Sequence, residues 1–423
     1  MSAPRRPPGS TPGASRAPRG TTRTALSLYS PTIATSIGTG AAVPVLALHA
    51  RELGASVGEA AFVVAAMGLG AIAGALPAST VIARVGERAI LVWGGVATAA
   101  AMLVAATAQD VRVLTAAMFF TGLTMTGFLQ ARQGHVMDSV PLHRRARALA
   151  LLGAAHRVGL LVGPLLGAAA IHLSGLRSVF WIAVALSTAG ALLAHLTVDR
   201  ARSVATEPPE RTLPVMWRER RTLATLGSTV VLMGMSRSVR DVVVPLWADH
   251  IGLSPATTSL VLAGAMAAEL VLTYPGGHLT DVVGRTPTAA AFLLGTAAAA
   301  LLLPLTSGLL SFAAVVTLVG AGNGLGSGIV MTLGADVAPI DARAQFLGAW
   351  RLCVDTGQAA GPLAVGVLVQ AASLATTATV FGSVLAAGSA WAGLWVRRAD
   401  VRRGEARSNT VPETLPSRPT AAA

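Results

Sequence analysis

The sequence predicts an all-α membrane protein with 12 transmembrane helices in two six-helix, pseudo-symmetric halves. Three observations lead to this fold class. Of the 423 residues, 53% are hydrophobic and only 12% are charged, whereas a soluble domain is about 25% charged. Apolar stretches of about 20 residues, each long enough to cross a bilayer as a helix, recur along the chain. Finally, the second half of the chain repeats features of the first.

The apolar stretches are continuous, whereas strands of a membrane β-barrel alternate in polarity over about ten residues. The first six predicted helices lie at 26–49, 57–82, 89–108, 112–135, 147–172 and 178–197. The second six lie at 223–248, 256–279, 287–306, 309–334, 344–370 and 374–396. We therefore divide the chain into a disordered basic N-terminal tail (1–23), a first six-helix bundle (24–198), a cytoplasmic central loop (199–221), a second six-helix bundle (222–396) and a disordered C-terminal tail (397–423).

The placement of arginine predicts the orientation in the membrane. The chain has no lysine and 32 arginines. If the N-terminus is cytoplasmic, 24 arginines lie in cytoplasmic segments, 3 in outer loops and 5 within helices. Positive charge concentrates on the cytoplasmic side of membrane proteins. We therefore predict a multi-pass protein of the plasma (inner) membrane with both termini in the cytoplasm, and no nucleic-acid partner despite the net charge of +13.

The composition also argues against several classes of function. The single cysteine, Cys353, cannot form an intramolecular disulfide, and a cysteine-based metal site is implausible. A Walker A loop needs a lysine, so the chain is not an ATP-driven pump by that route. We expect no cofactor and no metal, and the sequence lacks a paired motif of catalytic or metal-ligating residues. A membrane-embedded enzyme or a non-transporting sensor is therefore less favoured than a monomeric transporter in the lipid bilayer.

The two halves repeat at a spacing of 198 residues. Residues at three places in the first half have identical counterparts 198 positions later. These places are the end of the fourth predicted helix, the fifth predicted helix, and an earlier loop with a glycine. The pairs are Asp138 and Asp336, Pro141 and Pro339, Arg145 and Arg343, Gly159 and Gly357, Gly163 and Gly361, Pro164 and Pro362, and Gly86 and Gly284. Parallel repeats of six helices are typical of transporters built from two bundles around a central cavity.

The segment "GHLTDVVGR" contains Gly277, Asp281, Gly284 and Arg285. With the repeat, these residues make the chain resemble the major facilitator superfamily from about residue 24 to 396. The resemblance implies that this loop helps to hold a cytoplasmic gate. We expect Asp281 and Arg285 to do so against the arginine-rich start of the fifth helix, which contains Arg144, Arg145 and Arg147.

The first copy of this loop, "STVIARVGER", is degraded. It keeps Gly86, but Ser79 and Ala83 replace the glycine and the aspartate of the motif. The departure puts the gate contact in doubt on the side of the first half.

The fifth predicted helix carries Gly159, Gly163, Pro164 and Gly167 in "GLLVGPLLG". This spacing resembles the antiporter signature of drug-exporting members of the superfamily. Glycines four residues apart give a flat helix face for close packing, and a proline bends a helix. The alternative is that the residues serve helix packing alone.

Charges inside predicted helices mark the candidate site, because a charge inside a membrane costs at least about 2.5 kcal/mol on insertion scales. Arg237, Arg240 and Asp241 lie in the seventh helix, and Glu269 lies mid-span in the eighth. We expect Arg237 and Glu269 at similar depth and able to pair. The pair is either a fixed structural contact or the proton carrier, with Glu269 as the first candidate carboxylate and Asp241 as the second.

Five further polar residues complete the set. Arg351 and Asp355 are four residues apart and should pair on one helix face. His156 is more often a packing residue than a proton carrier. Arg132 either lines the cavity floor or extends to the inner headgroups. Asn323 is a candidate polar contact of the tenth helix.

Five arginines against three carboxylates within the helices favour anionic, zwitterionic or neutral amphiphilic substrates over cations. Our first hypothesis is a proton-coupled secondary transporter that exports small amphiphilic molecules by alternating access. Its substrate would contact Arg237, Arg240, Arg132 and Asn323. The alternative is a proton-coupled importer of a small organic anion that Arg237 and Arg240 bind.

Overall fold

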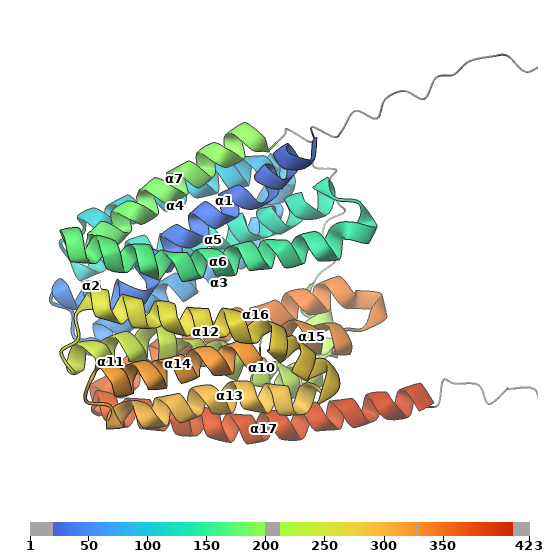
Figure 1. Ribbon diagram of the computed structural model, residues 1–423. Coiled ribbons are helices and arrows are strands. Elements are labelled where there is room, and N and C mark those ends of the chain that lie inside the picture. The colour runs from blue at the N-terminus through green and yellow to red at the C-terminus, as the bar shows by residue number, and fades with distance from the viewer. Residues whose placement is uncertain (1–19, 199–211, 327, 409–423) are drawn as a thin grey trace, which may run out of the picture.

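The computed structural model describes residues 20–198, 212–326 and 328–408, and every regular element in these ranges is helical. The predicted tails and central loop fall largely outside these ranges. Figure 1 shows two bundles, one above the other, whose helices run in roughly the same direction. The first helix begins and the last helix ends at the same end of the molecule, which we call the termini end. We call the opposite end the loop end.

The first bundle contains six membrane-crossing segments, of which the first is built from three consecutive helical pieces. In chain order its elements are α1 (Gly20–Ala42), η1 (Val43–Val45), α2 (Leu46–Glu52), α3 (Val57–Val85), α4 (Glu87–Thr107), α5 (Val111–Ser139), α6 (Leu142–Ser174) and α7 (Ser178–Thr197).

The second bundle follows the same order with more interruptions. Its elements are α8 (Thr212–Arg218), α9 (Arg220–Thr222), η2 (Leu223–Gly227), α10 (Ser228–Ser238), η3 (Val239–Val243), α11 (Val244–His250), α12 (Pro255–Val282), α13 (Arg285–Leu302), η4 (Leu303–Leu305), α14 (Leu309–Leu325), α15 (Ile329–Val337), η5 (Ile340–Ala342), α16 (Arg343–Ala371) and α17 (Leu374–Ser408).

Within the described residues, 11 helices are long and apolar enough to cross a membrane. The segment from α9 to α11, with its three charges at Arg237, Arg240 and Asp241, is the remaining one of the predicted twelve. Its charges lower its hydropathy without changing its place in the bundle. The predicted all-α, 12-helix fold class is thus supported.

Both ends of the second bundle differ from the predicted boundaries. Helix α8 lies within the predicted central loop, where Arg218 pairs with Asp341 at 2.8 Å. This guanidinium lowers the pKa of the Asp341 carboxyl by a hydrogen bond. Helix α17 continues past residue 396 to Ser408. Its continuation is stabilised by Arg398, which lies 4.8 Å above the ring of Trp395.

The 198-residue repeat extends to the backbone conformation of the loops. Glycines with positive φ recur at this spacing at both ends of the second helix of each half, and so do the serines that cap these helices. The pairs are Gly54 (φ 88°) and Gly252 (φ 76°), Gly86 (φ 85°) and Gly284 (φ 103°), and Ser56 and Ser254. Only glycine adopts positive φ without steric cost. The repeat is therefore a property of local structure as well as of sequence.

Glycines allow the helices of the first bundle to pack backbone against backbone. A Cβ atom at Gly122 of α5 would collide with the carbonyl oxygen of Met67 on α3. A Cβ atom at Gly70 would likewise collide with the carbonyl oxygen of Phe119. Backbone atoms cannot move aside as a flexible side chain can, so both positions require glycine.

We expect Gly122→Ala to destabilise the protein by about 1–3 kcal/mol through overpacking. The matched control is Gly153→Ala on α6, where nothing lies within 4 Å of the added Cβ. The control should be neutral or stabilising by about 0.5–1 kcal/mol because alanine favours a helix over glycine. Thermal unfolding of the purified protein in detergent measures both effects. Equal melting temperatures for the two variants would contradict the packing argument.

The two bundles contact each other through α3 with α16 and α6 with α12, and through α2 with α11 at the loop end. An ion pair also crosses the interface there, with Arg51 Nε 3.6 Å from Asp249 Oδ2. These two residues are themselves 198 positions apart, so they occupy equivalent places in the two halves. The loop end is therefore closed by contacts between the bundles.

Candidate substrate and proton site

The charged stretch of the seventh segment lies in a π-helical turn. Helix α10 passes into η3, a π-helix that contains Arg240 and Asp241, and the chain then continues as α11. Single π-helical turns inside α-helices occur frequently at functional sites. Here the turn places both side chains at a cavity between the two bundles.

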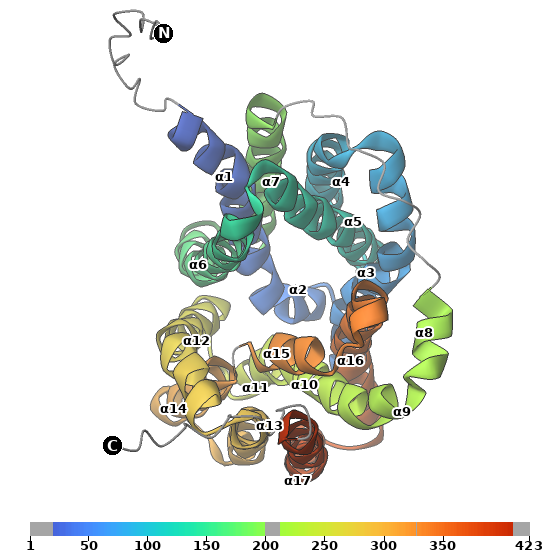
Figure 2. The ribbon, with the colours of Figure 1, turned by 90° about the vertical axis from the view of Figure 1, so that its right-hand side faces the viewer.

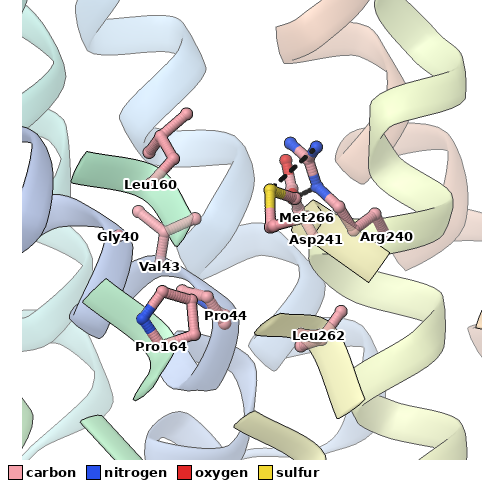
Figure 3. Close-up of a pocket in the computed structure, with 9 residues that line it drawn as sticks. All are labelled: Gly40, Val43, Pro44, Leu160, Pro164, Arg240, Asp241, Leu262 and Met266. Carbon is pink, nitrogen blue, oxygen red and sulfur yellow. Dashed lines mark hydrogen bonds and ion pairs between the residues drawn. The ribbon is translucent and has the colours of Figure 1, made fainter. Parts of the chain in front are cut away.

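This cavity is small, with a volume of about 40 Å³. Figure 3 shows its two sides: the wall from the first bundle is apolar, while the second bundle brings an ion pair beside apolar side chains. The lining residues are Gly40, Val43, Pro44, Leu160 and Pro164 from the first bundle, and Arg240, Asp241, Leu262 and Met266 from the second. The space holds only one or a few waters, so a larger substrate requires the bundles to move apart.

The guanidinium of Arg240 binds two carboxylates, of which Asp241 lines this cavity and Glu269 does not. The Nε atom of Arg240 lies 2.8 Å from Oδ1 of Asp241, and its Nη1 atom lies 3.3 Å from Oε2 of Glu269 on α12. The side chains of Arg240, Asp241 and Glu269 are only 11%, 25% and 18% exposed. We call these three residues the Arg240 triad. It carries a net charge of −1 when both carboxylates are ionised.

The predicted pairing of Arg237 with Glu269 is not the one formed, because Arg240 takes this place. The π-helical turn is the physical reason. Its wider winding changes which side chains project from the segment after Ser238, and Arg240 thereby reaches α12. Arg237 is half-buried and has no hydrogen bond or ion pair among the described residues, although the charges of the triad act on it.

Arg132 lies in the interior and does not extend to the headgroups. Its residue is only 8% exposed, and its Nε atom is buried without a hydrogen-bond partner. The charge of Arg351 on α16 acts on it across the interface between the bundles. The position at the headgroups is thus not the one observed, and Arg132 does not line the cavity of Figure 3 either.

The next predicted residue is His156 on α6. Its Nδ1 atom lies 2.6 Å from Oγ of Ser36 on α1, so a hydrogen bond fixes its ring. Seen from the termini end in Figure 2, α5 and α6 lie above the middle of the molecule and α10 and α16 below it. Four arginine charges from these helices act on His156, those of Arg132, Arg157, Arg237 and Arg351.

The other predicted contacts are partly observed. Arg351 Nε lies 2.9 Å from Asp355 Oδ1, as the four-residue spacing predicts, with the arginine side chain 56% exposed. Arg157 donates a hydrogen bond to Thr273 Oγ1 at 3.0 Å and so connects the bundles. Asn323 is buried, its Oδ1 has no hydrogen-bond partner, and it does not line the cavity of Figure 3.

The loop motif makes a contact within its own half. Arg285 Nε lies 3.0 Å from Oδ2 of Asp336, which joins α13 to α15. Asp281 is exposed and pairs with no described residue, so the expected contact with the start of α6 is absent in this arrangement. In the first half, Glu87 occupies the position equivalent to Arg285. Its carboxylate lies over Gly134 on α5, where a Cβ atom would collide with Oε1.

A model of the Major Facilitator Superfamily matches residues 29–228 and, a second time, residues 226–421. The chain belongs to the major facilitator superfamily. Each match covers one of the two repeated halves, in agreement with the 198-residue offset. The sequence resemblance and the predicted fold are thereby confirmed, and the chain is a multi-span membrane transporter of this superfamily.

Solved structures of other transporters share the fold. A variant of the nucleoside transporter NupG superimposes with a TM-score of 0.73 at 11% identity, covering 89% of this chain and 99% of that one. A POT family transporter in complex with 5-aminolevulinic acid gives 0.72 at 12% identity, covering 92% and 98%. Identities this low establish the fold alone. None of the curated proteins compared matches the sequence.

Within this superfamily member, the glycines of the antiporter-like motif pack α6 tightly on α1. A Cβ atom at Gly159 would lie 2.5 Å from Cβ of Ser36, and one at Gly163 would lie 2.5 Å from the carbonyl carbon of Gly40. Gly167 lies in ordinary contact distance of Ala41. Pro164 lies at the cavity, and its carbonyl oxygen accepts a hydrogen bond from Ser259 of α12.

The repeat copy makes the same kind of contact in the second half. A Cβ atom at Gly357 of α16 would collide with the carbonyl oxygen of Val231 on α10. One at Gly361 would collide with Oγ of Ser238. Because close packing occurs in both halves, packing alone accounts for the glycine spacing, and the spacing carries less information about the direction of transport.

We therefore expect Gly159→Ala and Gly357→Ala to destabilise the protein to a similar extent, by about 1–3 kcal/mol each. The control is Gly348→Ala on α16, where nothing lies within 4 Å of the new Cβ. Melting temperatures in detergent provide the comparison. If Gly159→Ala left stability unchanged and impaired transport only, the motif would have a function beyond packing.

Sequence reasoning missed the apolar wall of the cavity, because residues such as Val43 and Leu160 resemble any other membrane residue. It also missed the bond between His156 and Ser36, since two helices far apart in sequence supply it. What the sequence does reveal is a charge inside an apolar segment, which is costly in a membrane. Every member of the Arg240 triad was selected on this ground.

Proposed function

We propose that this chain is a proton-coupled secondary transporter that works by alternating access, with Glu269 as the proton carrier and Asp241 as the second candidate. The observation that carries the proposal is the Arg240 triad, in which one arginine is shared by two carboxylates at the interface between the bundles. Because Arg240 binds both carboxylates, protonation of one of them frees part of the guanidinium to bind another group.

A proton on Glu269 would remove its charge and weaken its bond to Arg240. The guanidinium would keep Asp241 and gain a free donor that faces the cavity. A substrate with an anionic group can accept this donor, so the proton and the anion bind together and cross together. Co-binding of this kind is symport, which an inward proton gradient drives in the direction of uptake.

The conclusion that the geometry supports best is therefore uptake of a small organic anion. Five arginines lie in the membrane segments against three carboxylates, and all three carboxylates already pair with arginine. The apolar wall of the cavity suits an anion with an apolar part. These features agree with the small-molecule substrates of the superfamily and add the sign of the charge.

Export of small amphiphilic molecules in exchange for protons is the second candidate. The observation in its favour is the antiporter-like glycine and proline spacing of α6, with Pro164 at the cavity. Exchange would require the proton and the substrate to compete for the same carboxylate. This condition fits a neutral or zwitterionic amphiphile that donates a hydrogen bond to Glu269.

The test is accumulation of a panel of labelled organic anions and neutral amphiphiles in cells that lack their own efflux pumps. Cells with the wild-type chain are compared with cells that carry Glu269→Gln, each with and without a protonophore. Accumulation that rises with the chain and collapses with the protonophore supports uptake, whereas lowered accumulation supports export. If proton-driven transport survives Glu269→Gln and fails in Asp241→Asn, Asp241 is the carrier. If neither variant nor the protonophore changes the flux, proton coupling is overturned.

A further inference from the structure

We infer that the second bundle carries a binding site for the headgroup of an anionic phospholipid. Its residues are Arg221 at the start of the seventh segment, and Trp395 and Arg398 in α17. The site lies on the surface of the bundle at the termini end, and the Arg240 triad lies further along the seventh segment. It stands independently of the proposed transport function.

Trp391 connects α17 to the start of the seventh segment. Its indole Nε1 atom donates a hydrogen bond to Ser228 Oγ at 3.0 Å and lies 3.4 Å from the carbonyl oxygen of Thr225 in η2. The seventh segment runs away from the termini end, and α17 runs towards it. Arg221 precedes Thr225 by four residues and Trp395 follows Trp391 by four, which is about one helical turn in each case. Arg221 and Trp395 therefore lie at similar depth, one turn nearer the termini end than this contact.

One face of α17 changes from apolar to cationic towards the termini end. Residues of this face follow each other at helical spacings of seven, four and three: Val384, Trp391, Trp395 and Arg398. The two tryptophan rings lie 5.6 Å apart, and the guanidinium of Arg398 lies 4.8 Å above the ring of Trp395. Tryptophan is enriched where a membrane meets water. A phospholipid presents an acyl chain, a glycerol backbone and a charged headgroup in the same order as this face.

The donors at the cationic end of this face have no acceptor among the described residues. Arg221 and Arg398 are exposed, and neither has a hydrogen bond or an ion pair there. The Nε1 atom of Trp395 is buried without a hydrogen-bond partner, whereas that of Trp391 has one. A buried N–H group without an acceptor is costly. Three donors around one place therefore indicate a ligand that accepts hydrogen bonds.

The carboxylates that lie nearest in sequence are held by other residues. Glu219 pairs with Arg218 at 3.3 Å, and Asp400 accepts a hydrogen bond from Thr286 at 3.1 Å. The positive charge of the site is thus available to an external anion.

The phosphate of a lipid headgroup suits this set of donors. A guanidinium binds a phosphate through two parallel hydrogen bonds, and a guanidinium that is stacked on an aromatic ring keeps its N–H donors at its edge. Arg398 can therefore hold a phosphate without leaving Trp395. Two arginines without a carboxylate favour a lipid of net negative charge over a zwitterionic one. The distribution of arginine predicts that this end faces the cytoplasm, where the membrane surface attracts basic segments through its anionic lipids.

The experiment measures lipid binding to the purified full chain in detergent by native mass spectrometry, with the melting temperature as a second readout. The probes are phosphatidylglycerol and phosphatidylcholine with the same acyl chains, and glycerol 3-phosphate, which has the phosphate without the acyl chains. We expect phosphatidylglycerol to bind and to raise the melting temperature. The other two probes should do neither at the same concentration.

Three variants and one control locate the site. Arg221→Gln and Arg398→Gln should each weaken phosphatidylglycerol binding about fivefold, the effect of one arginine near an anionic membrane surface. Trp395→Phe keeps a ring under Arg398 and removes the N–H donor, so it should also weaken binding. The matched control is Arg397→Gln, which removes the same charge at the same depth from another face of α17 and should bind as the wild type does.

Wild-type affinity in both Arg221→Gln and Arg398→Gln would overturn the inference. An equal loss in Arg397→Gln and Arg398→Gln would overturn it too, because it would show a general attraction of the basic surface and no site. If phosphatidylcholine binds as tightly as phosphatidylglycerol, the lipid is not selected by charge, and if glycerol 3-phosphate binds as tightly, the ligand is a soluble phosphate. Either result would contradict an anionic lipid site.

Discussion

Replacing Arg240 with glutamine is expected to destabilise the protein by about 3–5 kcal/mol, the usual cost of removing one partner of a buried ion pair. The reason is the geometry of the Arg240 triad. Asp241 and Glu269 would lose their common partner while they stay mostly shielded from water, with side chains only 25% and 18% exposed. Unfolding of the purified protein in detergent, followed by heat or denaturant, measures the loss.

Two controls make this expectation specific. Arg218→Gln removes an ion pair with Asp341 whose side chains are 49% and 68% exposed, so solvent replaces it and stability should barely change. Combining Arg240→Gln with Asp241→Asn and Glu269→Gln removes the unpaired charges and should recover most of the stability. A single Arg240→Gln variant as stable as the wild type would show that the triad is not a buried network.

Glu269→Gln should abolish proton-driven accumulation and flatten the pH dependence of substrate affinity. In the proposed mechanism a proton on Glu269 frees Arg240, so affinity for an anionic substrate should rise as the pH falls. One linked proton changes affinity by up to about tenfold per pH unit. The neutral glutamine imitates the protonated state, so the variant should bind the anion tightly at every pH and still exchange it across the membrane.

Transport in proteoliposomes with an imposed pH gradient measures this prediction. The matched control is Asp355→Asn, which removes a carboxylate of another ion pair in the same membrane region and should leave the pH dependence in place. A Glu269→Gln variant that retains the wild-type pH dependence would assign the proton to another group.

The membrane segments were predictable from the sequence because continuous apolar runs have no other stable arrangement in a bilayer. Their ends were less predictable. Helix α17 continues past residue 396 as a charged helix, because a water-exposed end needs no apolar residues to remain helical. The 198-residue offset predicted that the second half repeats the architecture of the first, and the positive-φ pairs Gly54/Gly252 and Gly86/Gly284 follow the same offset.

The candidate site was predictable in its membership but not in its pairing. The cost of a charge in the membrane was sufficient to select Arg237, Arg240 and Glu269. Which arginine reaches Glu269 depends on the π-helical turn at Val239–Val243, and a regular helical count does not contain that turn. Likewise, the burial of Arg132 depends on the packing of helices that are remote in sequence, so two positions remained equally plausible.

The ion pair between Arg51 and Asp249 has a consequence for the symmetry of the molecule. The two residues occupy equivalent positions in the two halves and face each other, so they lie near the axis that relates the halves. In a dimer of identical halves, every residue on that axis meets its own copy. Arginine would then meet arginine, or aspartate would meet aspartate, and the contact would be repulsive. An ion pair at this place therefore requires two halves that differ in sequence, as the halves of this chain do.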